Sequence, residues 1–415
     1  MTDQSLLVWW NDAIAGTLRQ DRHGDLGFAY DAGWVHAGRP ALSRSLPLRE
    51  EPFSRAECRP FFGGLLPEAQ QRNLAAGALG VSAANEFALL DRLGGDVAGA
   101  LTLLPAGQQP LPVTTRYNPR PLTEGELAGV LQRLPARPLL AGEEGLRLSL
   151  AGAQAKLPVV LMDGQLALPS PGQPTTHIIK PEIEHFPGSV ENEAFCMSLA
   201  ARVGLPVAHA EARAIENRRY LLVERYDRLT DADGHTTRLH QEDACQALGV
   251  PPERKYAAEG GPSFRDLFSL VRDYVRQPAP AVLNLLDVTI FNLIIGNADA
   301  HGKNFSFLLD HRGPRLAPFY DLLSTIHWPD LSPRMAMRLG GAGTIDEIDD
   351  DAWTNFAEAV GTTPRLVRQR VERLTTNVLA EIASFNPRDT TSEQILQRTA
   401  LRAKRIHGHR QSVSG

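Results

Sequence analysis

The sequence predicts an α+β fold in two lobes, in which a β-rich N-terminal lobe carries an added small β module and the C-terminal lobe is helical. Short apolar runs separated by turn residues dominate the first half of the chain, as is typical of β-rich regions. After Asp227 the apolar residues recur at helical spacings instead. The chain has 415 residues, and one core rarely grows past roughly 250–300 residues, so more than one packed unit is expected.

Residues 1–105 are expected to form the added β-rich module. Strand patterns lie at 6–10, 13–18, 26–30 and 34–36. Turn residues such as Asp31-Ala32-Gly33 separate them, and this spacing predicts a small antiparallel sheet or barrel. Helical patterns follow at 67–76 and 83–93, and a stretch with several Pro and Gly residues at 105–121 is the best candidate for a domain boundary.

Residues 106–226 are expected to complete the β-rich lobe. Apolar and polar residues alternate at 146–150, as they do in a half-buried strand. Apolar runs at 157–162, 177–180 and 220–223 predict three more strands, with a tight turn at Asp163-Gly164 after the first of them. The segment 190–203 is predicted to be a helix.

Residues 227–415 are expected to form the helical lobe, which ends in a basic helix and tail. The run 283–295 is apolar and long enough for a buried helix. The clearest helix covers 364–385, because Thr363 is a good N-cap, Pro364 suits the first helical position, and apolar residues recur every three or four positions.

The overall composition excludes several classes of protein. A net charge of −5 argues against general, non-specific binding to nucleic acid. Three cysteines without a C-x-x-C pair favour reduced thiols over a disulfide framework, and the 12 histidines show no metal-binding spacing. No secretory signal is apparent, and no apolar run approaches the ~20 residues of a membrane-spanning helix. We therefore expect a cytoplasmic protein without zinc.

The segment from Asp299 to Asn304 has the D-x-x-x-x-N spacing of a phosphoryl-transfer loop. Such a reaction needs a carboxylate that accepts the proton of the attacking hydroxyl, and an oxygen ligand for Mg²⁺ nearby. Asp321, in the following Phe-Tyr-Asp sequence, can supply a second oxygen ligand. The Gly302-Lys303 pair is not the end of a P-loop, because Asn297 stands where that motif requires Gly.

Further features precede this segment in the order in which protein kinases carry them. A loop of small residues at 151–156 can bring backbone N–H groups close to phosphate oxygens. Lys180 ends an apolar strand and can pair with a carboxylate of the next helix, for which Glu193 is favoured over Glu191. The strand that ends at Glu224 can form a hinge beside adenine. The shared order, more than any single motif, predicts ATP-dependent phosphoryl transfer.

These motifs resemble those of the HipA family, the kinase toxins of bacterial HipA–HipB toxin–antitoxin pairs. The matching segments extend over most of the chain and are the stretches 149–156, 177–181, 191–193, 223–228, 241–243, 296–306 and 319–321. The resemblance implies a two-lobed, protein-kinase-like fold and a serine/threonine protein kinase that uses ATP and Mg²⁺.

The resemblance also implies roles for individual residues. Asp299 would accept the proton, and Asn304 and Asp321 would hold Mg²⁺. Ser149 would be phosphorylated by the kinase itself, which would switch the enzyme off. The residues expected at the nucleotide are Ala151, Gly152, Ala153, Gln154, Ala155, Lys156, Lys180, Glu224, Arg225, Tyr226, His301, Gly302, Lys303, Asn304, Tyr320 and Asp321.

The implied partners are a HipB-like helix-turn-helix antitoxin and a protein substrate. The expected substrate is an aminoacyl-tRNA synthetase, with glutamyl-tRNA synthetase as the first candidate, so that translation stalls and growth stops. Operator DNA would be reached only through the antitoxin complex, with Arg368 and Arg370 on DNA phosphates. A solvated helix face explains these two arginines equally well.

Two departures from the best-known family members concern the phosphate-binding elements. Ala155 replaces a glutamate, and Pro181 directly follows Lys180. Neither change removes a catalytic group, so a difference is expected in loop regulation rather than in chemistry. Two alternatives stay open: a small-molecule phosphotransferase of the aminoglycoside type, and a catalytically silent co-repressor, against which the intact Lys180 and Asp299 argue.

Overall fold

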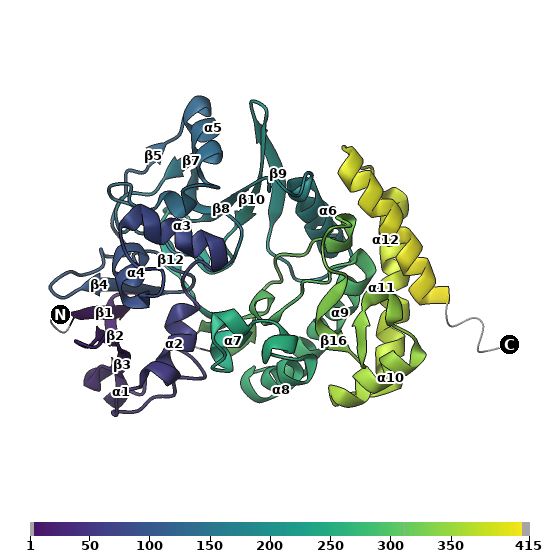
Figure 1. Ribbon diagram of the computed structural model, residues 1–415, viewed down its shortest axis with the longest axis horizontal. Coiled ribbons are helices and arrows are strands. Elements are labelled where there is room, and N and C mark those ends of the chain that lie inside the picture. Colours follow the sequence, from purple (N-terminus) through teal and green to yellow (C-terminus); the bar gives the residue numbers. More distant parts are fainter. Residues whose placement is uncertain (1–3, 311, 409–415) are drawn as a thin grey trace. The chain divides into compact units, whose positions relative to one another are not determined.

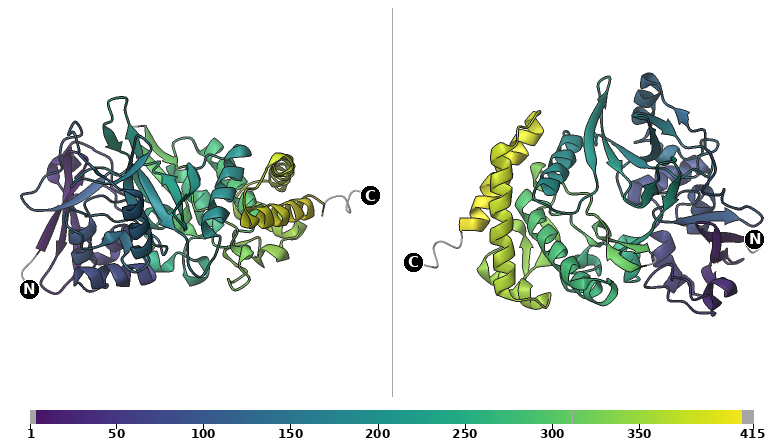
Figure 2. Two further views of the ribbon diagram at one scale, coloured as in Figure 1. Left: turned by 90° about the horizontal axis from the view of Figure 1, so that it is seen from above. Right: turned by 180° about the vertical axis from the view of Figure 1, so that it is seen from behind.

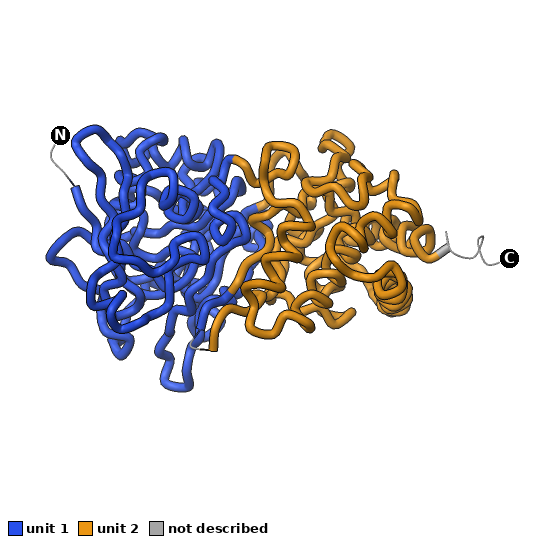
Figure 3. The backbone as a smooth tube through the Cα atoms, turned by 90° about the horizontal axis from the view of Figure 1, so that it is seen from below, with its two compact units in different colours: residues 1–181, 213–253, 308–311 blue, residues 182–212, 254–307, 312–415 orange. Residues whose placement is uncertain are grey.

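The computed structural model describes residues 4–310 and 312–408 (Figures 1 and 2). The chain forms two compact units, each assembled from separate stretches of sequence (Figure 3). Unit 1 comprises residues 1–181, 213–253 and 308–311, and unit 2 comprises residues 182–212, 254–307 and 312–415. Sheets and helices occur together, which confirms the predicted α+β class.

Unit 1 begins with a four-stranded antiparallel sheet in the order β3-β2-β1-β4. Its strands are β1 (Gln4–Trp10), β2 (Ala13–Gln20), β3 (Leu26–Tyr30) and β4 (Leu101–Pro105). The first three strands confirm the predicted ones. Strand β4 was not predicted, because it is far along the chain from β1, the strand with which it pairs.

The strand expected at 34–36 is wrong, since these residues belong to a short helix, α1 (Ala32–His36). Asp31 gives the physical reason. Its carboxylate accepts hydrogen bonds from the backbone N–H groups of Gly33 (2.9 Å) and Trp34 (3.2 Å) and so caps a helix. The residues interpreted as a turn are therefore a helix start.

Three further helices complete the core of this part of unit 1: α2 (Arg55–Gly63), α3 (Ala69–Leu79) and α4 (Glu86–Leu93). The last two confirm the predicted helical segments with later starts, whereas α2 was not predicted. Side chains from the sheet and the helices share one apolar core, in which Phe28, Phe61 and Phe62 are fully buried.

The second sheet of unit 1 has the strand order β5-β7-β6-β8-β10-β9. The bounds are β5 (Arg120–Pro121), β6 (Leu157–Met162), β7 (Gln165–Leu168), β8 (His177–Pro181), β9 (Ala210–Ile215) and β10 (Arg218–Glu224). The three strands predicted from apolar runs are confirmed, and so is the tight turn, at which Asp163 and Gly164 both have positive φ. Helix α5 (Glu124–Arg133) packs against this sheet.

No regular strand forms at 146–150, so the alternation there was misleading. Leu148 makes only an isolated bridge to Asp96. Backbone hydrogen bonds from Asp96 N–H to Arg147 and from Ser149 N–H to Asp96 fix the segment on both sides of this bridge. The stretch 105–121 lies within unit 1.

Unit 2 is mainly helical. Its helices are α6 (Ser189–Arg202), α8 (Phe264–Tyr274), α9 (Pro278–Ile295), α10 (Asp350–Ala359), α11 (Pro364–Ser384) and α12 (Thr390–Gly408). Helix α9 is central, since α8, α11 and α12 all contact it. By length and composition α9 resembles a membrane span, but 67% of it is buried inside the fold, as expected for a core helix.

The predicted helices of this unit are confirmed at α6, α9 and α11. At the start of α11, the side chain of Thr363 accepts a hydrogen bond from Leu366 N–H (3.2 Å), and Pro364 follows at the first helical position. The long helices α11 and α12 contact each other and lie next to each other in the right-hand view of Figure 2.

The remaining elements are short. They are β11 (Arg228–Thr230), β12 (Thr236–Arg238), β13 (His240–Asp243), α7 (Ala244–Ala247), β14 (Ser306–Asp310), β15 (Gly313–Leu316), β16 (Arg334–Leu339) and β17 (Ala342–Thr344). Strands β11 and β12 form a hairpin directly after the predicted hinge.

Candidate active site

Asp299 stands at the end of the central helix of unit 2, on a loop that is itself buried. Gly296 ends α9 in the left-handed conformation (φ 81°), where an added Cβ would lie 2.4 Å from the side chain of Ile326. The side chain of Asn297 donates a hydrogen bond to that of Asn292 (2.9 Å) and accepts one from the N–H of Asp299 (3.0 Å). The Asp299 side chain is exposed, so a rigid loop presents a carboxylate to solvent.

One hydrogen bond joins the side chains of Asn304 and Asp321, the two proposed metal ligands. The Asn304 side-chain N–H donates to the carboxylate of Asp321 (3.1 Å), and its side-chain oxygen accepts from the N–H of His301 (3.2 Å). Asp321 has a positive φ of 59°. Such a backbone conformation is unfavourable for a residue with a Cβ and persists only where neighbours hold it.

The donor set at this position suits Mg²⁺. Asp321 has a carboxylate and Asn304 an amide oxygen, their side chains are in contact, and Mg²⁺ prefers a small number of protein oxygens together with phosphate and water. A bound Mg²⁺ would neutralise phosphate charge during phosphoryl transfer.

The other predicted residues of unit 2 surround this pair. The Tyr320 hydroxyl donates to the carbonyl of Lys303 (2.6 Å) and bonds to Ser306, so it fixes the Asp321 segment against the catalytic loop. The imidazole of His301 packs edge-on against Tyr256, at 5.4 Å between ring centroids. The N–H of Gly302 donates to the carbonyl of Lys255 (3.3 Å).

In unit 1, Lys180 lies on β8, where it is paired with Leu221 of β10 and is 7% exposed. Glu193, on α6, belongs to unit 2 and is 5% exposed. Burial of both side chains is consistent with charged groups that need a partner. The pairing of Lys180 with Glu193 stays a prediction.

A hydrogen bond from Lys156 connects the two ends of the loop of small residues at 151–156. The ammonium of Lys156 donates to the carbonyl of Ala151 (2.7 Å), and Gly152 has a φ of 117° that a side chain would not tolerate. Gln154 reaches the carbonyl of Pro181 (3.4 Å). Ala155 is 8% exposed and belongs to the apolar core beside the second sheet, an environment that suits Ala better than a glutamate.

Ser149 is fully buried just before this loop. Its hydroxyl donates to the carbonyl of Leu65 (2.7 Å), and its relative exposure is 0%. The 151–156 loop is tied to the same neighbourhood, because Gly152 forms a bridge with Pro67 and accepts from Glu68 N–H (3.1 Å). A phosphoryl group on Ser149 does not fit without movement of this segment.

The predicted hinge runs into a buried network of charged side chains that the sequence did not reveal. The Asp96 carboxylate accepts from Arg228 (2.8 Å), Arg238 (3.1 Å) and Arg225 (3.2 Å), and Asp227 pairs with Arg225 and Arg228. Burial alone would raise the pKa of Asp96, but the nearby arginine charges outweigh it and hold that pKa below its usual range. Burial lowers the pKa of Arg228 to about 10.

This network decides what the hinge residues offer to a ligand. The Arg225 guanidinium binds Asp96, Asp227 and the carbonyl of Val97. Its backbone N–H donates to the carbonyl of Thr176 (2.9 Å), and its carbonyl accepts from the N–H of Arg228 (3.2 Å). The Glu224 side chain is exposed. The Tyr226 hydroxyl donates to the side chain of Gln241 (2.5 Å).

The motif at 241–243, to which the sequence assigned no chemistry, holds the hinge in place. Gln241 donates to Asp227 (3.2 Å) as well as accepting from Tyr226. Asp243 caps α7 through a bond from the N–H of Gln246 (2.9 Å). Its resemblance to the family was the only signal in the sequence for this role.

The two arginines predicted to contact DNA differ in their surroundings. The Arg370 guanidinium binds the carboxylate of Asp287, an α9 residue that is 4% exposed, through Nε at 2.7 Å and through Nη2. The guanidinium of Arg370 therefore already has a buried partner, and its contact with DNA stays a prediction. Arg368 is exposed. Arg410, part of the expected basic tail, lies outside the described residues.

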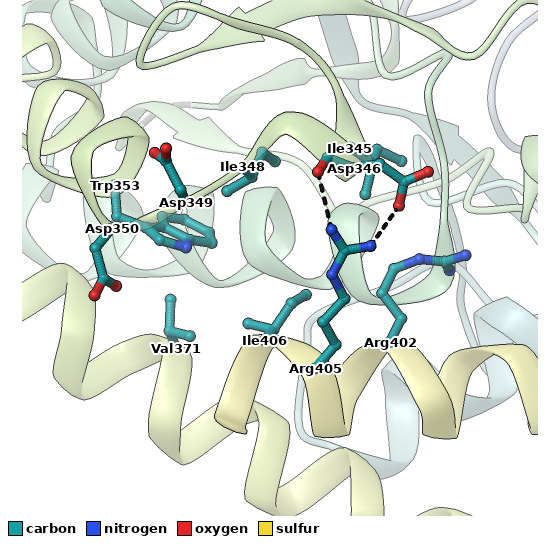
Figure 4. Close-up of a pocket in the computed structure, with 10 residues that line it drawn as sticks. All are labelled: Ile345, Asp346, Ile348, Asp349, Asp350, Trp353, Val371, Arg402, Arg405 and Ile406. Atoms are coloured by element: carbon teal, nitrogen blue, oxygen red, sulfur yellow. Dashed lines mark hydrogen bonds and ion pairs between the residues drawn. The ribbon is translucent and has the colours of Figure 1, made fainter. Parts of the chain in front are cut away.

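A pocket of unit 2 lies apart from all these residues (Figure 4). Among its polar lining residues, Arg405 donates hydrogen bonds to the side chain of Asp346 (2.9 Å) and to the carbonyl of the same residue (3.0 Å). Beside it, burial lowers the pKa of Arg402 to about 10. None of the lining residues belongs to the predicted site.

Comparisons with known proteins give one consistent result. Residues 6–104 match the model of the HipA N-terminal domain, and residues 148–382 match that of the HipA-like C-terminal domain. The chain is 59% identical over 386 residues to Y4mE, a candidate kinase of Sinorhizobium fredii, with 92% of both chains covered. It is 32% identical to the serine/threonine-protein kinase toxin HipA of Shewanella oneidensis, covering 90% of this chain and 87% of the toxin.

A solved structure agrees with these sequence matches. The fold resembles that of a chain in the complex of HipA, HipB and operator DNA from Shewanella oneidensis MR-1, with a TM-score of 0.84 and 29% identity. The match covers 98% of this chain and 99% of the other. The similarity confirms the predicted HipA-like fold.

Proposed function

The chain belongs to the HipA family, and from that premise we propose that it is an ATP-dependent serine/threonine protein kinase that acts as a growth-arresting toxin. The main support is the catalytic segment of unit 2, where a rigid loop exposes Asp299 and a hydrogen bond of 3.1 Å joins Asn304 to Asp321. The named activity of the Shewanella oneidensis relative supports the same reaction.

Each residue has a role in this proposal. Asp299 accepts the proton of the attacking Ser or Thr hydroxyl, while Asn304 and Asp321 hold Mg²⁺. From unit 1, Lys180 and the backbone N–H groups of the 151–156 loop contact phosphate oxygens. The backbone from Glu224 to Tyr226 contacts adenine, and the buried ion network holds it in one conformation. An ATP requirement also supports a cytoplasmic location.

Autophosphorylation of Ser149, between molecules, is the proposed off-switch. A phosphoserine carries about −1.5 to −2 charges at neutral pH. The Ser149 hydroxyl is buried against a carbonyl oxygen, which would repel such a group, so the modified segment has to leave its position. Because Gly152 and Glu68 are hydrogen-bonded next to it, the phosphate-binding loop is expected to move with this segment.

The proposed partners follow from the relatives. The solved HipA structure contains HipB and operator DNA, so a HipB-like helix-turn-helix antitoxin is the proposed inhibitor of this chain. Through that complex, Arg368 is a candidate for contact with DNA phosphates. An aminoacyl-tRNA synthetase, first of all glutamyl-tRNA synthetase, is the proposed substrate, and its modification would stop translation.

The decisive experiment is phosphoproteomics after a short pulse of expression, with the Asp299→Asn variant as the matched control. We expect new phosphoserine or phosphothreonine on one synthetase, and on Ser149 itself, only with the wild-type chain. Phosphorylation of a small molecule and of no protein would favour an aminoglycoside-type phosphotransferase. Absence of any transfer, combined with retained antitoxin and operator binding, would favour a silent co-repressor.

A further inference from the structure

Asn192 is a buried polar residue of α6 whose side chain binds the backbone of a distant segment. Its carbonyl oxygen accepts a hydrogen bond from the N–H of Ser324 (2.7 Å), and its amide donates to the carbonyl of the same residue (3.0 Å). Both residues are 0% exposed. The side chain thus pairs with both polar backbone groups of one residue, as a neighbouring strand would.

An amide is the side chain suited to this task. It offers a donor and an acceptor in one plane, whereas a hydroxyl or a carboxylate offers a different pattern. Without it, a buried N–H and a buried carbonyl of Ser324 would lose their partners, and such groups are costly to leave unpaired. Asn192 therefore fixes the position of the Ser324 backbone.

The anchored segment is the one that carries the proposed metal ligand. Asp321 lies three residues before Ser324 and has the strained φ of 59°. On the other side of the anchor, the Thr325 hydroxyl accepts from Ala298 N–H (2.8 Å) and donates to the carbonyl of Gly296 (3.2 Å). The segment is thus tied to α6 by Asn192 and to the catalytic loop by Thr325, and both ties lie within unit 2.

We propose that Asn192 is a positioning residue for the metal-binding carboxylate of Asp321, a role that rests on the proposed kinase function. It acts by holding the backbone downstream of Asp321, so that the carboxylate stays beside Asn304. The same helix carries Glu193, the proposed partner of Lys180.

The test compares the binding of AMP-PNP, a non-hydrolysable ATP analogue, with Mg²⁺ and with EDTA. Calorimetry on the full chain gives the ratio of the two affinities, which measures the contribution of Mg²⁺. Groups that orient a metal ligand typically contribute 10–100-fold to metal affinity, so we expect this ratio to fall by about tenfold or more in Asn192→Ala. Affinity in EDTA should stay within about threefold of wild type.

Two further variants separate positioning from general stability. Leu199→Ala, on the same helix, removes a fully buried side chain that makes no hydrogen bond to the Ser324 segment, and it should lower the melting temperature but keep the ratio. Asn192→Asp retains the acceptor for Ser324 N–H but places a buried carboxylate against the Ser324 carbonyl at neutral pH, and should lower the ratio at least as far as Asn192→Ala.

The outcomes distinguish this inference from the proposed function. If wild-type protein binds AMP-PNP equally with Mg²⁺ and EDTA and transfers no phosphoryl group, the proposed function fails. If wild type depends on Mg²⁺ and folded Asn192→Ala shows the same ratio, the role of Asn192 is refuted while the function stands. Loss of folding in both Asn192 variants would also overturn it, because Asn192 would then be required for the fold as a whole.

Discussion

Removal of the Asp96 charge is expected to destabilise unit 1 strongly. The Asp96→Asn substitution conserves shape and keeps an acceptor for the Thr175 hydroxyl, which now lies 2.7 Å from the carboxylate. It removes the negative charge on which three arginines converge. Asp227 would then be left to balance them, and breaking a buried ion pair costs about 3–5 kcal/mol. We expect a loss in that range.

The assay is urea unfolding of the full chain, with the slope compared between variants to check that the same surface is exposed. Asp346→Asn is the matched control. It removes the negative charge that Arg405 contacts at 2.9 Å, but the side chains of Asp346 and Arg405 are 82% and 51% exposed, so the loss should be about 1 kcal/mol or less. A loss below about 1 kcal/mol for Asp96→Asn would refute the reasoning.

The lowered pKa of Asp96 also determines how the stability difference between wild type and Asp96→Asn changes with pH. Because the folded-state pKa of Asp96 is held below its ordinary value of 3.8, the contribution of Asp96 to stability is fully present above pH 3.8. It is lost only as the pH falls through the lowered pKa. The difference between wild type and Asp96→Asn should therefore be constant from pH 7 to pH 5.

Three further predictions address catalysis, the basic helix and acid stability. Asp299→Asn should lower the phosphoryl-transfer rate by about 10²–10⁴-fold while AMP-PNP still binds, and a rate within a few-fold of wild type would contradict the assignment. Arg370→Ala should cost about 1–3 kcal/mol of stability through the loss of its bonds to Asp287, whereas Arg368→Ala should change stability by less than about 0.5 kcal/mol and reduce the salt dependence of operator binding by the antitoxin complex. Burial lowers the pKa of His240 to about 4, so the neutral imidazole contributes stability that is present above pH 6.5 and is lost as the pH falls toward 4. That loss is about 3 kcal/mol, and urea unfolding of His240→Gln across this range should lack it.

The sequence predicted those parts of the fold that depend on local pattern. Strands β6 and β8 and helix α11 came from periodicity and capping, which act over a few residues. The spacing from Asp299 to Asn304 was equally local. That Asp321 belongs to the same site was inferred from the order of kinase motifs. In the structure, the side chains of Asn304 and Asp321 are hydrogen-bonded.

The features that escaped prediction depend on contacts between distant residues. Asp96 and Arg228 are 132 positions apart, as are Asn192 and Ser324, and neither pairing leaves a periodic trace. Asp31 misled in another way, because one side chain that caps a helix overrode a short apolar strand pattern. The buried partner of Arg370, Asp287, also escaped prediction, because it belongs to another helix.

The division of the chain into interleaved stretches has a consequence for synthesis on the ribosome. When the ribosome has translated strand β8 with Lys180, the neighbouring strand β10 has not yet been translated. The carboxylate of Asp96 likewise has no partner until its arginines, such as Arg228, have been translated. Unit 1 therefore has no complete sheet or hinge until the stretch 213–253 has emerged. A prematurely released fragment would be an unfinished, protease-sensitive chain rather than a partly active kinase. The proposed metal ligand Asp321 lies later still in the chain, so the candidate site is complete only after translation has passed that residue.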